Sequence, residues 1–137
     1  MSKLIKPFSF VDKITRAELN LVDSSYAVAL SNTAPSLEDV STIDQVTQID
    51  ELGGYQAGGE PVANVRNIGT DGLFILGGDA VEFTATGGNY PPFRYLVIYQ
   101  VESGNVIGWY DYADQVTLTQ GNFFRLNVIS SGFLRVA

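Results

Sequence analysis

The sequence predicts a single, mainly antiparallel all-β domain, either a β-sandwich or a jelly-roll-like fold, with one short helix and an extended N-terminal arm. Three observations support this prediction. Short apolar runs with two-residue alternation recur along most of the chain, as half-buried strands require. Most of the 14 glycines lie between these runs, where tight turns need backbone conformations that glycine adopts easily. No linker, repeat or low-complexity segment divides the 137 residues, a length that suits one domain.

The first sixteen residues differ from the rest of the chain in charge. They hold Lys3, Lys6, Lys13 and Arg16 against Asp12 alone, a net charge of +3. The remaining residues carry −10, which gives −7 for the whole chain. We therefore divide the chain into a basic arm, residues 1–16, and a β-domain, residues 17–137. The arm is either a solvated terminus or a contact for an acidic partner, and the acidic β-domain should repel nucleic acid.

About ten segments have the length and composition of strands. They are residues 17–21, 26–30, 61–68, 73–76, 81–86, 93–101, 106–112, 116–119, 123–129 and 133–136. Segment 93–101 is the strongest, because apolar side chains occur at both alternating sets of positions. We expect that strand to be central, with both of its faces covered. The turn at residues 102–105 should join it to the next strand as a hairpin.

Between the second and third of these strands the pattern changes to that of a helix. Ile43, Val46 and Ile49 are spaced three apart, as on one helical face, and Gly53-Gly54 would end the helix. Four glycines then lie within residues 53–59. A phosphate-binding loop would continue with Lys and Ser or Thr, whereas Glu60-Pro61 follows here. We interpret residues 53–59 as a bend that leads into a strand.

The residue types in the chain exclude several kinds of site. Histidine and cysteine are both absent, which removes the Ser-His-Asp and Cys-His triads and the usual zinc ligands. All three lysines lie in the arm. We therefore expect no catalytic residue, no metal and no cofactor. No apolar run approaches the ~18 residues of a membrane span, and residues 1–10 lack a secretion signal, so we expect no membrane partner and assembly in the cytoplasm.

A second interpretation concerns the aromatic and acidic side chains of two loops. Tyr90, Trp109, Asp111 and Asp114 would form a ligand site that recognises a glycan or a protein. Asp111 and Asp114 could also act as the acid pair of a glycan-cleaving enzyme. Oxygen ligands for calcium are a further option. The simplest alternative is the polar end of a strand that leads into a turn.

Arg94 lies within the most apolar strand, so its guanidinium should need a partner. Asp79, Glu82 and Asp111 are the candidate carboxylates, and we expect a structural ion pair between Arg94 and Asp79.

Several segments together resemble a family of small virion proteins of tailed bacteriophages. They match in order and spacing over roughly residues 50–137, and the N-terminal third matches more loosely through residues 26–30. The matching segments are Gly54–Val65 (GYQAGGEPVANV), Gly78–Gly88, Pro92–Tyr99, Val106–Tyr112 and Val116–Asn122.

The resemblance implies a capsid decoration or cement protein, which sits on the capsid surface of the virion and clamps its subunits together. It also implies a homotrimer that binds the major capsid protein, and it brings no catalytic residues. The alternative role for such a virion protein is a tail-associated or receptor-binding module that recognises a host surface glycan or protein through Tyr90, Trp109, Asp111 and Asp114. The basic arm lies outside the well-matched region. We expect it to be a capsid contact, so that deletion of residues 1–16 would weaken capsid binding while the β-domain stays folded.

Overall fold

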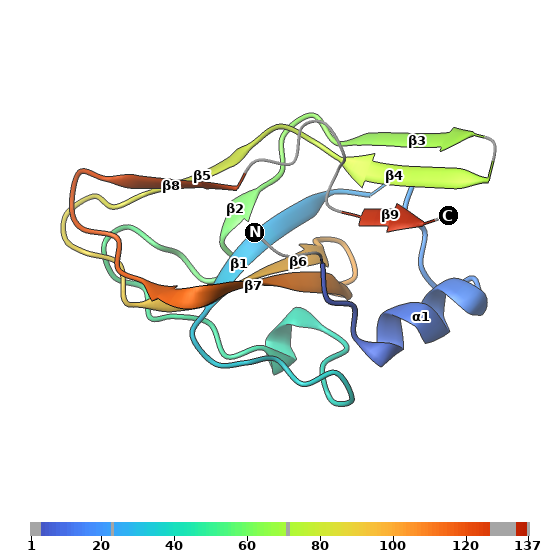
Figure 1. The fold of residues 1–137 in the computed structure, drawn as a ribbon, viewed down its shortest axis with the longest axis horizontal. Helices are drawn as coiled ribbons and strands as arrows, with labels where there is room; N and C mark the ends of the chain where they lie inside the picture. The colour runs from blue at the N-terminus through green and yellow to red at the C-terminus, as the bar shows by residue number, and fades with distance from the viewer. Residues whose placement is uncertain (1–3, 23, 71, 127–133, 137) are drawn as a thin grey trace.

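The computed structural model describes residues 4–22, 24–70, 72–126 and 134–136. It confirms a small, mainly antiparallel all-β fold with one short α-helix (Figure 1). The elements, in chain order, are α1 (Phe8–Thr15), β1 (Tyr26–Ser31), the 3-10 turn η1 (Ile43–Gln45), β2 (Glu60–Pro61), β3 (Arg66–Thr70), β4 (Leu73–Gly77), β5 (Val81–Thr84), β6 (Phe93–Gln100), β7 (Val106–Val116), β8 (Phe123–Leu126) and β9 (Leu134–Val136).

The described strands form three sheets in which neighbours are antiparallel. The largest has the order β2-β1-β6-β7, and the smaller ones have the orders β3-β4-β9 and β5-β8. In Figure 1 the two smaller sheets lie end to end above the four-stranded sheet. One apolar cluster contains side chains from β1, β4, β5, β6, β8 and β9. The main core therefore lies between the four-stranded sheet and the two smaller sheets.

The four-stranded sheet is covered on both faces, as predicted for its strand β6. Leu96 and Ile98 belong to the main core, which we call the first-face core. Val97 and Tyr99, which alternate with them, belong to a smaller cluster, the second-face core. Its buried members are Ala27, Ala29, Val40, Val46, Val97, Tyr99, Val106 and Trp109. No strand covers this second face among the described residues; Ile5 and Ile43 pack against it from segments without strand structure.

The predicted helix after residue 42 is reduced to the single turn η1. Gln45 and Thr42 form a capping box, but the backbone is already extended at Val46 (φ −97°, ψ 130°). Val46 packs in the second-face core, whereas Ile49 packs in the first-face core. The three-residue spacing therefore reflects a chain that passes from one face of the sheet to the other. β-branched residues, which are weak helix formers, favour this extended path.

The α-helix lies instead at residues 8–15, where the sequence predicts an extended arm, and that part of the prediction is wrong. The predicted strand at residues 17–21 is also wrong, since Ala17 adopts a left-handed conformation (φ 57°). The strand predicted at residues 106–112 is longer in the structure, as β7 (Val106–Val116), and residues 117–119 of the next predicted strand have no strand structure. Residues 127–133 of the last predicted strands lie outside the described part of the chain.

The glycine-rich segment 53–59 is a bend that leads into β2, as predicted. A Cβ atom on Gly59 would overlap the carbonyl oxygen of Val28 in β1, so only glycine fits there. Tyr55 holds the bend from inside: its hydroxyl accepts a hydrogen bond from Leu30 N (3.0 Å) and donates one to Gln48 Oε1 (2.7 Å). Burial raises the pKa of Tyr55 to about 12, so this donor stays protonated.

Candidate functional site

Residues 4–7 are attached to the edge of the four-stranded sheet. The amide of Ile5 donates to the carbonyl of Trp109 (2.8 Å), and the amide of Trp109 donates back (2.9 Å). Gly108 makes this close approach possible, because a Cβ atom there would lie 2.5 Å from the carbonyl oxygen of Ile5. Ile5 thereby packs against the second-face core, to which Trp109, 3% exposed, also belongs. This segment closes part of an edge that would otherwise offer unpaired backbone groups.

Helix α1 continues this attachment. Phe10 is buried in the first-face core. The amide of Phe8 donates to the carbonyl of Leu37 (3.0 Å), and the hydroxyl of Ser9 donates to the carbonyl of Val40 (3.0 Å). Residues 4–15 are therefore part of the folded body in this structure, and they do not form a separate arm.

The four basic residues that the sequence assigned to a capsid contact have different roles. Lys3 lies outside the described residues. Lys13 turns inward, and its ammonium donates to Ser41 Oγ (2.8 Å) and to Asn105 Oδ1. Lys6 and Arg16 are exposed. Of the three basic residues of this set that the structure describes, Lys6 and Arg16 are therefore the two that a partner could reach.

The outward side of α1 is apolar at two positions. Phe8 and Val11 are spaced three apart, so they share one side of the helix, and their side chains are 56% and 53% exposed. We call this pair the α1 knob. Leu37 is also exposed and lies beside this pair, because its carbonyl accepts the hydrogen bond from the Phe8 amide. Asp12 and Thr15 are exposed on the same side of the helix, so the knob has a polar border.

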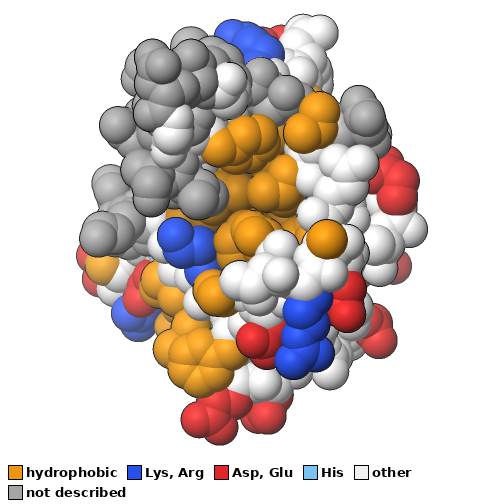
Figure 2. All heavy atoms as spheres, turned by 90° about the vertical axis from the view of Figure 1, so that its right-hand side faces the viewer, with side chains coloured by type: hydrophobic (Ala, Val, Ile, Leu, Met, Phe, Trp, Pro, Cys, Tyr) orange, Lys and Arg blue, Asp and Glu red, His pale blue; other side chains and the backbone are white. Residues whose placement is uncertain are grey.

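An open apolar hollow lies at the other end of α1. It has a volume of about 440 Å³ and is lined by Ile14, Ala17, Leu19, Asn20, Leu21, Val22 and Phe74. We call it the end hollow. Figure 2 faces this end of the molecule and shows hydrophobic side chains gathered near the centre of the view. The left-handed turn at Ala17 creates the hollow, because it directs residues 19–22 away from the helix axis and towards β4.

Arg94 pairs with Asp111, so the predicted pair with Asp79 is wrong. Its Nε lies 2.7 Å from Asp111 Oδ1 and its Nη2 lies 3.1 Å from Oδ2. The guanidinium is also 40% exposed, so it is not the buried charge that the apolar strand predicted. Antiparallel pairing places Asp111 opposite Tyr95, the neighbour of Arg94. Asp111 also accepts a hydrogen bond from the amide of Ala113 (2.8 Å), and this bond holds the end of β7 in place.

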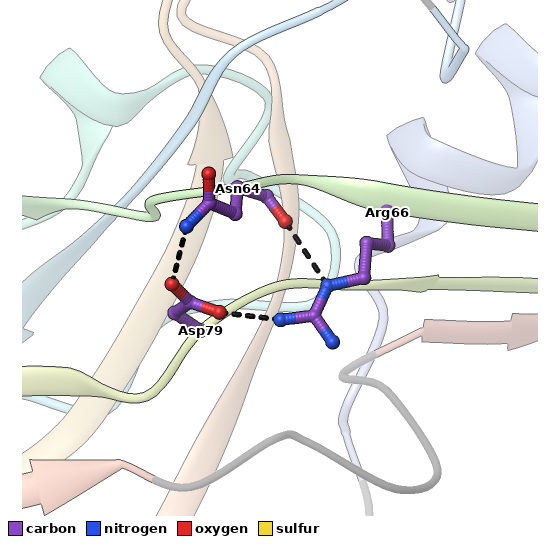
Figure 3. A network of polar contacts seen from close by, with 3 residues as sticks. All are labelled: Asn64, Arg66 and Asp79. Atoms are coloured by element: carbon purple, nitrogen blue, oxygen red, sulfur yellow. Dashed lines mark hydrogen bonds and ion pairs between the residues drawn. The ribbon is translucent and has the colours of Figure 1, made fainter.

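Asp79 belongs to a different contact, shown in Figure 3. Its carboxylate pairs with Arg66 and accepts a hydrogen bond from Asn64 Nδ2 (2.6 Å). Its backbone amide donates to the carbonyl of Ala63 (2.9 Å). The three side chains thus join the chain before β3 to the chain after β4. The side chains of Arg66 and Asp79 are 53% and 42% exposed, so this network lies at the surface and holds the two segments together.

The structure does not bring together the four residues of the predicted ligand loop. Tyr90 is buried in the first-face core, where it packs edge-on against Tyr55 with ring centroids 5.8 Å apart. Trp109 is buried in the second-face core, on the opposite side of the sheet. Asp114 is exposed. Neither aromatic ring is available to stack on a sugar, so the glycan-binding site predicted from these residues is wrong.

Asp111 is also unsuited to the acid role in glycoside cleavage. The Arg94 guanidinium beside it, together with the amide of Ala113, lowers the pKa of Asp111 below its usual range. A general acid needs the opposite shift, so that the carboxyl stays protonated at working pH. Within the described part of the chain, no cluster of three or more acidic residues could hold a metal ion. In the same residues, no helix is long and apolar enough to cross a membrane.

Sequence reasoning missed the α1 knob and the end hollow. A signal was present, because Phe10 and Ile14 are spaced four apart and follow Pro7, which suits the start of a helix. In comparisons with known proteins, the chain matches no family model, no curated protein and no solved structure. The resemblance to phage virion proteins therefore stays a prediction.

Proposed function

We propose that this chain is a structural protein of a bacteriophage virion, which binds the outer surface of the capsid as a homotrimer and stabilises the shell. The resemblance of residues 50–137 to small virion proteins supplies the class of protein. The structural observation that supports it is the α1 knob, because Phe8 and Val11 are exposed on a helix that is fixed to a rigid body. Exposed apolar groups of this kind are typical of protein contacts.

The mechanism is thermodynamic. A protein that binds the assembled shell, and does not bind its free subunits, shifts the assembly equilibrium towards the shell. The major capsid protein is the proposed partner, and the virion surface is the proposed location. No catalytic step is part of this function, and the segments that resemble the family build the fold: Gly59 allows the bend against β1, and Asp111 holds the end of β7.

The test is binding to capsids of the phage that encodes the chain, prepared without this protein. We expect the purified protein to co-sediment with these capsids and to raise their dissociation temperature. Free capsid subunits are the control and should not bind. Absence of co-sedimentation across a range of salt concentrations would refute the proposal. Gold-labelled antibody on intact particles then gives the location, with label over the head expected and label confined to the tail contradictory.

A further inference from the structure

We propose that residues 4–15 are exchanged between copies of this chain, so that in the oligomer they take on a second copy the place that they take here on their own body. We call residues 4–15 the strap and residues 16–18 the hinge. This inference deepens the oligomeric part of the proposed function and rests on it for the number of copies. A segment that passes from each copy to the next can close a ring of three.

The contacts that an exchanged strap makes are those that the structure already contains. Ile5 exchanges two backbone hydrogen bonds with Trp109. Phe10 is buried in the first-face core, and the Lys13 ammonium donates to Ser41 Oγ (2.8 Å). These contacts join the strap to the body, and the hinge takes part in none of them. Exchange therefore keeps them and changes only which chain supplies the strap.

The hinge is a tight reversal of the chain that is built around an alanine. The amide of Glu18 donates to the carbonyl of Lys13 (2.8 Å), and the amide of Ala17 donates to that of Ile14 (3.2 Å). This pair of bonds is that of a Schellman motif, in which the left-handed residue is usually glycine. Here that residue is Ala17 (φ 57°), and its Cβ disfavours the left-handed conformation. Short hinges under strain favour exchange, because the open hinge relieves the strain.

The surroundings of the hinge allow it to open. Arg16, Ala17 and Glu18 are all exposed, and residues 16–22 belong to no helix or strand. Ala17 lines the end hollow, which has a volume of about 440 Å³, so a change in its conformation disrupts little packing. The chain is held by the body again at Leu19, which is buried in the first-face core. The change of direction is therefore confined to the hinge.

Charge favours capture of a released strap by either copy. Residues 1–16 carry +3 and the rest of the chain carries −10. A basic segment is attracted to the acidic body of its own chain and to that of a second chain, and this attraction speeds their encounter. Because the attraction is the same in both cases, the conformation of the hinge decides between the closed chain and the exchanged oligomer.

The first experiment changes the hinge and measures the mass of the protein in solution by sedimentation and light scattering. We expect the wild-type protein to be an oligomer. Ala17→Gly relieves the strain of the closed hinge, so it should shift the equilibrium towards the monomer by about tenfold for each strap. Ala17→Pro fixes φ at about −65° and prevents the closed hinge, so it should favour the oligomer.

Ala113→Gly is the matched control for the hinge variants. Ala113 is also exposed and left-handed (φ 75°), but it lies in β7. This variant should leave the mass in solution unchanged. A monomeric wild-type protein would overturn the inference, and so would an oligomer that Ala17→Gly shifts no more than Ala113→Gly does.

The second experiment traps the strap on the body that holds it. Residues that exchange both backbone hydrogen bonds in an antiparallel pair have Cα atoms about 5.5 Å apart, a distance that a disulfide spans. Ile5 and Trp109 are such a pair, and the chain has no cysteine of its own. After oxidation, the double variant Ile5→Cys/Trp109→Cys should migrate as a covalent oligomer on a denaturing gel without reductant.

Ile5→Cys alone is the control for disulfides that form by chance. A disulfide confined to single chains of the double variant would overturn the inference. The melting temperature shows whether the double variant is folded. The hinge variants keep Trp109, and they decide the question if the double variant does not fold.

The outcome separates this inference from the proposed function. A wild-type monomer that binds capsids would overturn the exchange and leave the virion role intact. An exchanged oligomer that does not bind capsids would support the exchange and refute the virion role.

Discussion

The two faces of the four-stranded sheet are covered in different ways, although they share the same strands. Leu96 and Ile98 of β6 meet the strands of the two smaller sheets on the first face. Val97 and Tyr99 of the same strand meet single side chains from irregular segments, such as Ile5 and Val40, on the second face. The first cover is built from paired strands and the second from short lengths of chain. We therefore expect the second face to open first in local unfolding.

The difference also explains what residues 4–16 do. Their inward side chains, Ile5 and Phe10, complete the two cores, and their outward side chains, Phe8 and Val11, remain exposed. One short segment therefore covers the body and presents the surface that we propose as a contact. Changes to its inward side should lower stability, whereas changes to its outward side should alter association.

The largest expected effect is that of deleting residues 1–16. The deletion removes Phe10 from the first-face core and removes Ile5, which packs against the second-face core. We expect the free energy of unfolding to fall by more than about 4 kcal/mol, a loss near the upper range for removal of a single buried aromatic side chain. Urea unfolding followed by Trp109 fluorescence measures it. Unchanged stability would restore the separate arm that the sequence predicts.

A pair of substitutions in β6 compares the faces directly. Leu96→Ala should lower the free energy of unfolding by about 3–4 kcal/mol, because it leaves a cavity between two layers of strands. Val97→Ala removes fewer atoms beside a thinner cover and should cost about 2 kcal/mol. Both side chains are fully buried, so exposure does not confound the comparison. Chemical denaturation gives both values, and a larger loss for Val97→Ala would contradict the account.

Gly108→Ala tests the attachment of the N-terminal segment alone. The added Cβ would meet the carbonyl oxygen of Ile5, so the segment must move away from β7. We expect a loss of about 1–2 kcal/mol, typical of a change that disturbs one local contact. Limited proteolysis should cut the variant near its N-terminus while the β-body stays intact. Gly69→Ala is a useful control for an added methyl group, because its backbone is not left-handed and the nearest atom to its Cβ position, on Phe74, lies at an ordinary contact distance of 3.7 Å.

The smallest expected effect concerns how the free energy of unfolding changes at acidic pH. Arg94 lowers the pKa of Asp111 in the folded protein below its ordinary value of 3.8. Asp111 therefore adds stability that is present above pH 3.8 and is lost as the pH falls through the lowered pKa. Arg94→Met should remove much of this contribution and flatten the dependence of stability on pH below about 4. Thermal melts between neutral and acidic pH measure it; an unchanged slope would argue against the Arg94–Asp111 pair.

The sequence predicted the elements whose signal is local. The apolar residues at both alternating sets of positions along 93–101 were enough to predict a central strand with two covered faces. The glycines at 53–59 were enough to predict a bend. The partner of Arg94 was not predictable, because it depends on the register between β6 and β7.

The candidate site was harder to predict because its side chains pack against residues that are distant in the sequence. Trp109 was predicted to face a ligand, but it is buried in the second-face core, against which the distant residue Ile5 packs. Val46 and Ile49 look like one helical face, although they pack on opposite faces of the sheet. In each case the deciding partner is distant in sequence, and no local pattern records it.

The most direct test of the account is the hydrogen exchange of the Ile5 amide in the free protein. Its hydrogen bond to Trp109 (2.8 Å) exists only while the segment covers the second face. We expect the Ile5 amide to exchange much more slowly than an unstructured peptide amide, and we expect Gly108→Ala to remove this protection. Exchange of Ile5 at the rate of a free peptide in the wild-type protein would contradict the account.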